Sequence, residues 1–386
     1  MIVMVTISLA ALVLARAVAT PSPRTPAQGM PIAPASRGAR QEPAPMPPHN
    51  PDRYASSAVG EPGTLGGALR AMSPARYARF MEGREAFTTA FTPAMGLGPY
   101  FEETSCAACH FHPTVGGSSL ERLVTISPGP PPGYEAEHHP AHALPGWAPR
   151  VPPPDASPSR PRPLYGLGLI EDVPEAVIVA GCDPDDRDGD GVRGRPAMYG
   201  GVLHRFGSKA HQRTVRDFAQ NALFDDMNVT SGLSDFHGQD RDALPDPEVS
   251  ERYIDRLAEF VRGLAPPPRA GAHPEGEAVF ARVGCAACHR QDLGPQARGA
   301  FTDLCLHDMG PALANGVTDK AARPQDYRTP PLWGLRHQRM LLHDGRARTV
   351  EAAILAHGGE AAASRARFAA LPPDQRAALL AFLQTL

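Results

Sequence analysis

Cysteine and histidine occur together in two identical pentapeptides, Cys-Ala-Ala-Cys-His, one in each half of the chain. The residues concerned are Cys106, Cys109 and His110 in the first copy and Cys285, Cys288 and His289 in the second. Two thiols at this spacing can form thioethers with the vinyl groups of one porphyrin, and the adjacent histidine then reaches the iron. A single copy would also suit a zinc ligand pair or a redox dithiol. Two copies predict two covalently bound haem c groups, with the histidines as proximal iron ligands.

The N-terminus has the pattern of an export signal. Residues 2–14 are almost wholly apolar, and the small residues Ala17-Val18-Ala19 follow, so we expect cleavage before Thr20. The apolar run is short for a membrane span, although an uncleaved anchor helix is the alternative. We therefore expect residues 1–19 to be a signal peptide. The mature protein would then lie in the periplasm, without an integral membrane span.

The charge balance excludes some classes of partner. The 386 residues include 38 Lys and Arg against 41 Asp and Glu, with no long basic run and no basic amphipathic stretch. Such a chain does not suit nucleic acid or a membrane surface. The sequence does not define the oligomeric state.

Proline and glycine mark the loops. Many of the 44 prolines and 37 glycines gather in two tracts, residues 20–50 and 128–163. The first is expected to be a disordered tether, because it cannot bury enough apolar surface to offset chain entropy. Alternating strand patterns are scarce, whereas helical spacing occurs at residues 75–88, 251–264, 275–283 and 373–386. The sequence therefore predicts a mainly α protein with long Pro/Gly-rich loops.

The run Pro266-Pro267-Pro268 suggests a domain boundary. We expect an N-terminal c-type haem domain with loop insertions at residues 51–265. A C-terminal cytochrome c-like haem domain is expected at residues 266–386. In the second domain, the helix before the haem motif should cross the final helix of the chain.

Cys182 and Cys305 are the cysteines outside the haem motifs. An oxidising compartment favours a disulfide between them, which would join the two domains. Two separate buried thiols are the alternative, because the sequence does not give their distance.

Many segments resemble the di-haem oxidoreductases, a family also called thiol oxidoreductases and distantly related to bacterial di-haem cytochrome c peroxidases. The matching segments, in the family's order, are residues 80–87, 96–99, 163–171, 183–185, 205–207, 302–304, 307–310, 329–335, 343–346 and 357–360. The resemblance implies a peroxidase-like enzyme with one reactive haem and one electron-transfer haem. Its partner would be a small redox protein, or peroxide or an organic substrate. An electron-transfer cytochrome without catalytic chemistry is the alternative.

The second haem needs a sixth ligand if it only transfers electrons. Residues 349–357 are typical of a short helix, on which Val350, Ile354 and His357 share one face. By the resemblance, His357 stands where the family places the distal iron ligand. Met309 and Met340 are the rival ligands, and a solvated helix-terminal histidine is the remaining alternative.

The first haem is the candidate for a reaction with peroxide. Cleavage of the O–O bond requires an acid/base group nearby. By the resemblance, Glu171 or Glu175 has this role, and a surface glutamate is the alternative. A second polar set could line the same pocket or be solvated: Lys209, His204 and His211. Four further histidines are open candidates as distal ligands or loop residues: His112, His138, His139 and His142.

Asp186, Asp188 and Asp190 begin an Asp-x-Asp-x-Asp-Gly sequence that is typical of a calcium loop. The twelfth position is Ala197, so the bidentate glutamate of a full EF-hand is missing. The sequence predicts at most a partial Ca²⁺ site, with a metal-free acidic turn as the alternative.

Overall fold

The computed structural model describes residues 58–129, 136–232, 240, 242 and 244–386. The predicted signal peptide and tether lie outside these residues. No helix in the described part of the chain is long and apolar enough to cross a membrane.

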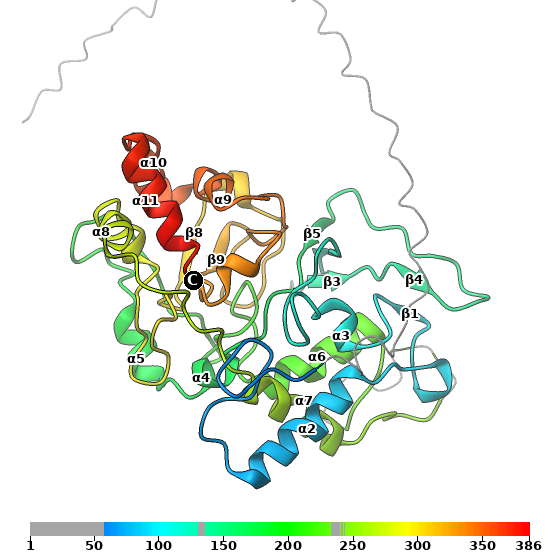
Figure 1. The fold of residues 1–386 in the computed structure, drawn as a ribbon. Helices are drawn as coiled ribbons and strands as arrows, with labels where there is room; N and C mark the ends of the chain where they lie inside the picture. The colour runs from blue at the N-terminus through cyan, green and yellow to red at the C-terminus, as the bar shows by residue number, and fades with distance from the viewer. Residues whose placement is uncertain (1–57, 130–135, 233–239, 241, 243) are drawn as a thin grey trace, which may run out of the picture. The chain divides into compact units, whose positions relative to one another are not determined.

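Helices supply most of the regular structure (Figure 1). The α-helices of the described residues are α2 (Pro74–Thr88), α3 (Cys106–Cys109), α4 (Leu167–Glu171), α5 (Glu175–Gly181), α6 (Val215–Met227), α7 (Glu251–Gly263), α8 (Pro274–Arg282), α9 (Val350–Ala356), α10 (Ala362–Ala369) and α11 (Pro373–Leu383). Short 3₁₀ helices are η1 (Pro93–Met95), η2 (Cys285–Ala287), η3 (Pro311–Leu313), η4 (Leu335–His337) and η5 (Gly359–Ala361). The prediction of a mainly α protein is confirmed.

Helices α2 and α7 pack closely around the first haem motif. Ser73 caps α2 by accepting a hydrogen bond from the amide of Arg76. At Gly83 of α2, a Cβ atom would lie 2.2 Å from the carbonyl oxygen of Arg256 in α7, so only glycine allows this approach. The Phe260 ring of α7 lies 4.9 Å from the Phe87 ring of α2, which ends beside the motif.

Helices α8 and α11 form the corresponding pair next to the second motif. A Cβ atom at Gly276 of α8 would lie 2.1 Å from the carbonyl oxygen of Ala378 in α11. The rings of Phe280 and Phe382 lie 5.3 Å apart in the core between the two helices. The expected contact between the helix before the motif and the final helix is therefore present.

The strands are short and antiparallel. They are β1 (Tyr100–Phe101), β2 (Val124–Pro128), β3 (Ala136–His138), β4 (His142–Ala143), β5 (Ser157–Ser159), β6 (Met198–Tyr199), β7 (Val202–Leu203), β8 (Leu306–Asp308) and β9 (Asp326–Arg328). Three of them form a sheet in the order β3-β2-β5, and β1 pairs with β4, β6 with β7 and β8 with β9. Residues 128–163, expected to be a loop, thus contain strands. Pro158 fits here because β5 is an edge strand.

Cys182 and Cys305 form a disulfide bond. Cys182 ends α5, and Cys305 immediately precedes β8. The bond therefore links the segments that the sequence analysis assigns to different domains.

Candidate functional site

The second pentapeptide lines a cavity of about 260 Å³, here called the C-terminal cavity. Cys285, Cys288 and His289 all face it. The Nδ1 atom of His289 donates to the carbonyl oxygen of Phe301 at 2.9 Å, which leaves Nε2 for an iron ligand bond. Burial lowers the pKa of His289 to about 4, so the ring is neutral, as a metal ligand requires.

The first pentapeptide has the same arrangement in a second cavity of about 250 Å³, here called the N-terminal cavity. Cys106, Cys109 and His110 line it. The Nδ1 atom of His110 donates to the carbonyl oxygen of Gly117 at 3.0 Å. Burial also lowers the pKa of His110. Each cavity thus offers two thiols and one oriented, neutral imidazole, which are the groups that a covalent haem requires.

The thiols do not suit a redox dithiol. Burial raises the pKa of Cys106 to about 12 and that of Cys285 to about 12, so thiolates are scarce at neutral pH. A redox dithiol reacts through its thiolate form. The apolar surroundings instead fit sulfur atoms bonded to a porphyrin.

His357 faces the C-terminal cavity together with His289. It follows the last residue of α9, and its Nδ1 atom donates to the carbonyl oxygen of Ala353 at 2.7 Å. Burial lowers the pKa of His357, so this imidazole is also neutral with Nε2 available. Of the two rival ligands, Met309 lines the cavity. Met340 is buried, but it is not among the described residues that line the cavity.

The N-terminal cavity contains a buried acidic group that the sequence analysis missed. Glu102 follows β1, is 2 % exposed and lines the cavity with Asp226 of α6. Burial and the nearby charge of Asp226 raise the pKa of Glu102 to about 7. His138 of β3 lies 3.1 Å from Asp226; burial lowers its pKa, but Asp225 and Asp226 outweigh this and raise it to about 9.

Glu171 and Glu175 lie elsewhere. The carboxylate of Glu171 pairs with Arg262 of α7 and accepts a hydrogen bond from the amide of Val215 at the start of α6. The side chain of Glu175 is half exposed and lies 3.8 Å from Arg205. Neither glutamate is among the described residues that line the two cavities. The expectation that one of them faces the first haem is therefore corrected: the ion pair and the helix N-terminus hold Glu171 away from it.

The second polar set is divided. Lys209 and His211 line the N-terminal cavity, whereas His204 is not among its described lining residues. The Nζ atom of Lys209 donates to the carbonyl oxygens of Arg323, Pro324 and Asp326 at 2.7–3.0 Å. Burial lowers the pKa of Lys209 to about 7. The three hydrogen bonds hold its ammonium group against the backbone of residues 323–326.

His138 is the one member of its group of four histidines that lines the N-terminal cavity, among the residues that the structure describes. His112 pairs with Ser118 through its backbone, and the ring of His139 lies 2.8 Å from the hydroxyl of Ser127. The ring of His142 packs 5.5 Å from that of Phe101. These three are loop and strand residues.

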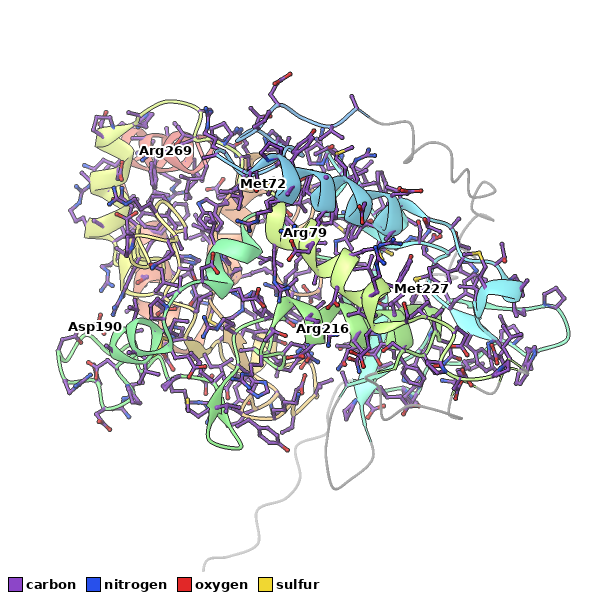
Figure 2. All side chains as sticks on the ribbon, turned by 90° about the horizontal axis from the view of Figure 1, so that it is seen from below. Met72, Arg79, Asp190, Arg216, Met227 and Arg269 are labelled. Atoms are coloured by element: carbon purple, nitrogen blue, oxygen red, sulfur yellow. A yellow bond between two sulfur atoms is a disulfide. The ribbon has the colours of Figure 1, made fainter. Side chains whose placement is uncertain are left out.

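The carboxylates of Asp186, Asp188 and Asp190 lie close enough together to share one cation. Figure 2 shows Asp190 on a loop at the periphery of the molecule. Backbone amides satisfy the same carboxylates: Gly191 donates to Asp186 at 3.0 Å, and Val192 donates to Asp190 at 2.8 Å. The arrangement suits an acidic turn as well as a calcium loop, and Ca²⁺ binding stays a prediction.

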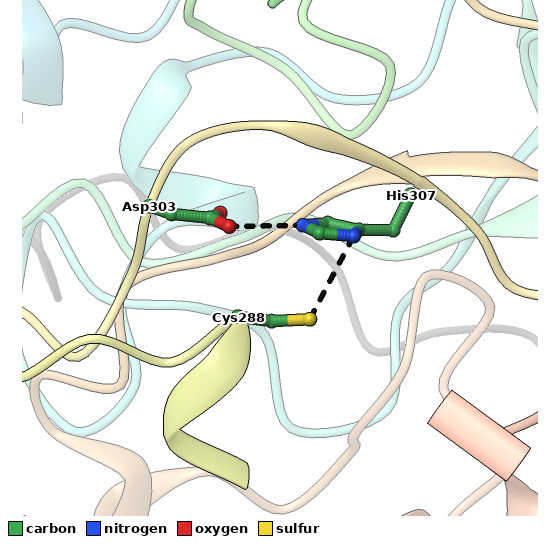
Figure 3. A group of neighbouring side chains, drawn as sticks. All are labelled: Cys288, Asp303 and His307. Carbon is green, nitrogen blue, oxygen red and sulfur yellow. Dashed lines mark hydrogen bonds and ion pairs between the residues drawn. The ribbon is translucent and has the colours of Figure 1, made fainter. Parts of the chain in front are cut away.

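The His307 side chain lies between Asp303 and Cys288 (Figure 3). His307 donates to Asp303 at 2.9 Å and to Glu360 at 2.8 Å, and its Nδ1 atom lies 3.7 Å from the sulfur of Cys288. Burial lowers the pKa of His307, but the hydrogen bond to Asp303 and its other partners hold it well above its usual value. These contacts link His307 to the second motif through Cys288 and to the carboxylates of Asp303 and Glu360. The i, i+4 spacing of Asp303 and His307 was the only local sign of these contacts in the sequence.

Two cavities, each lined by two cysteines and a neutral, oriented histidine, define a protein that holds two haem-type cofactors. Residues 159–386 match the family described as "Di-haem oxidoreductase, putative peroxidase". The chain belongs to this di-haem oxidoreductase family, and it is an oxidoreductase with two haem groups.

Solved structures are similar to the chain at low identity. A hydrazine synthase of Kuenenia stuttgartiensis is 15% identical with a TM-score of 0.39, over 90% of this chain and 100% of that chain. The diheme peroxidase BthA of Burkholderia thailandensis is 17% identical with a TM-score of 0.42, over 83% of this chain and 87% of that chain. No curated protein matches the sequence.

Proposed function

We propose that the chain is a periplasmic, peroxidase-like oxidoreductase with covalently bound haem c. One haem is attached by the first pentapeptide within residues 51–265 and the other by the second within residues 266–386. The observation that carries the proposal is the repeated cavity, in which a backbone carbonyl orients each pentapeptide histidine. His110 and His289 are the proximal ligands in this scheme, and His357 is the distal ligand of the second haem.

The different linings of the two cavities support different roles for the haems. Three neutral histidines line the C-terminal cavity: His289, His343 and His357. The His343 ring is stacked on Tyr327 at 4.2 Å, whereas His289 and His357 would hold one iron between them, which suits electron transfer. The N-terminal cavity combines His110 with Glu102 and Asp226. Acidic groups and the His138 imidazolium beside the His110 imidazole suit a reaction that consumes protons.

Bound haem would supply the iron and the electrons for reducing peroxide, and the chain's own residues would manage the proton. With a pKa of about 7, the Glu102 carboxyl group can take up and release a proton near neutrality. Asp226 keeps that pKa raised by repulsion, and the His138 imidazolium offsets part of the buried negative charge. The electron donor would be a small redox protein.

Two haems per chain are expected in a haemochrome assay of the purified protein. Replacing Cys106 or Cys285 with alanine should weaken attachment at that site alone, because each pentapeptide lines its own cavity. Covalent attachment is checked by whether haem stays with the denatured polypeptide. One haem per wild-type chain, or haem extracted fully by acid and organic solvent, would contradict the proposal.

His357→Met should raise the reduction potential of the second haem, because a thioether ligand favours ferrous iron more than an imidazole does. Electron paramagnetic resonance should show a changed low-spin signal for that haem and an unchanged signal for the first. Met309→Leu is the matched control and should leave both signals as in the wild type. If the control changes the spectrum and His357→Met does not, Met309 is the ligand.

The class of function is tested by adding hydrogen peroxide to the haem-loaded protein. An oxidoreductase with one reactive haem should show a high-spin ferric population that changes on mixing. If both haems are six-coordinate and do not react with peroxide in any redox state, the chain is an electron-transfer cytochrome instead.

A further inference from the structure

Three arginines lie in the wall between the two cavities. Arg160, Arg162 and Arg328 each line both the N-terminal and the C-terminal cavity. Arg160 and Arg162 come from the segment that follows β5, and Arg328 ends β9. We call these three residues the arginine cluster. Because they border both cavities, a group bound in either cavity can reach them.

The contacts of the arginine cluster leave its charge uncompensated. Arg160 donates to the carbonyl oxygen of Leu342 at 2.8 Å and to the side-chain oxygen of Gln338 at 2.9 Å. Arg328 donates to the carbonyl oxygen of Gly207 at 2.9 Å. These acceptors are neutral. Within the described part of the chain, no carboxylate forms an ion pair with any of the three guanidinium groups, and the Arg162 side chain has no hydrogen bond.

Two partly buried arginines elsewhere in the molecule form ion pairs. Arg262 binds Glu171, and Arg195 binds Asp326. Burial lowers the pKa of Arg160 to about 9, of Arg162 to about 10 and of Arg328 to about 9, so all three remain charged at neutral pH. Arg328 is buried, and Arg160 and Arg162 are partly buried beside it. Three like charges gathered in one wall are costly unless anions join them.

We propose that the arginine cluster binds propionate carboxylates of both haems and holds the two cofactors with their propionate edges toward one shared wall. The inference rests on the proposed function, since it requires a haem in each cavity. Guanidinium groups suit this role because their planar donors match a carboxylate in a bidentate way. A charge in the shared wall acts on both irons, so the cluster should set both reduction potentials together.

The test is a spectroelectrochemical titration of the full-length, haem-loaded protein carrying Arg162→Gln. Losing a positive charge favours the ferric form, so both midpoint potentials should fall. Each fall should equal a threefold to tenfold change in the reduction equilibrium, where tenfold is about 59 mV for one electron. Arg160→Gln and Arg328→Gln should also shift both haems. Arg162→Lys keeps the positive charge, so both of its midpoint potentials should stay close to those of the wild type. Arg298→Gln, at an exposed arginine, should leave both potentials unchanged.

A shift confined to one haem, or absent from both, in the glutamine variants overturns the proposal. So does an Arg162→Lys shift as large as that of Arg162→Gln, because packing would then be the cause. If Arg162→Gln loses haem, the Arg160 and Arg328 variants decide by the same criteria. A wild-type protein with fewer than two haems contradicts the proposed function itself, whereas two haems with independent shifts contradict the arginine proposal alone.

Discussion

Glu102→Gln is expected to slow the reaction of the haem-loaded protein with peroxide by about a hundredfold to ten-thousandfold, the usual effect of losing a positioned acid/base. Glutamine keeps the size and polarity of the side chain but cannot exchange a proton. Both haems and the resting spectrum should be retained. Stopped-flow absorption at several pH values is the measurement: the wild-type rate should change around pH 7, where Glu102 titrates, and the variant's rate should not.

Two further variants make this result specific. Glu171→Gln should react at close to the wild-type rate, because the structure commits that carboxylate to Arg262 and the start of α6. Asp226→Asn removes the charge that helps to raise the pKa of Glu102, so the pH profile should move to lower pH. A fast Glu102→Gln variant beside a slow Glu171→Gln variant would return the role to Glu171. No peroxide reaction in any form would favour the electron carrier.

Replacing both Cys182 and Cys305 with alanine should lower the free energy of unfolding by about 4–5 kcal/mol. The disulfide spans 123 residues, and closing so long a loop removes much of the entropy of the unfolded chain. Both residues are buried, so alanine adds no bulk. Urea unfolding, followed by circular dichroism with both haems attached, measures the loss.

Wild-type protein treated with a thiol reductant is the matched control, because it loses the disulfide but no side chain. It should unfold at nearly the same urea concentration as the double variant, since thioether bonds to haem resist the reductant. Two alkylatable thiols in the denatured, unreduced wild-type protein would show that the bond is absent in solution. Equal stability of variant and wild type would show that the bond contributes nothing.

Functional residues that lie close together along the chain could be predicted from the sequence. The two pentapeptides hold thiols and histidine in one short segment, so no distant part of the chain is needed to find them. Local spacing also predicted a short helix at residues 349–357, and the structure has α9 there with His357 directly after it; the ligand role of His357 came from the family resemblance. The glycine and phenylalanine residues of α2 do not indicate which other helix packs against it. The close approach of Gly83 to α7 is therefore visible only in the structure.

The sequence by itself determined the cofactor class, the mainly α composition and the short helix that ends next to His357, because each depends on local spacing. Only the tertiary structure decided which acidic and basic groups face the cavities. Glu102 follows β1, Asp226 belongs to α6 and His138 to β3, and no local pattern joins them. Arg160 and Arg162 lie in a proline-rich stretch that looked like a solvated loop. Burial and neighbouring charge govern what these groups do, and both arise when distant segments pack together.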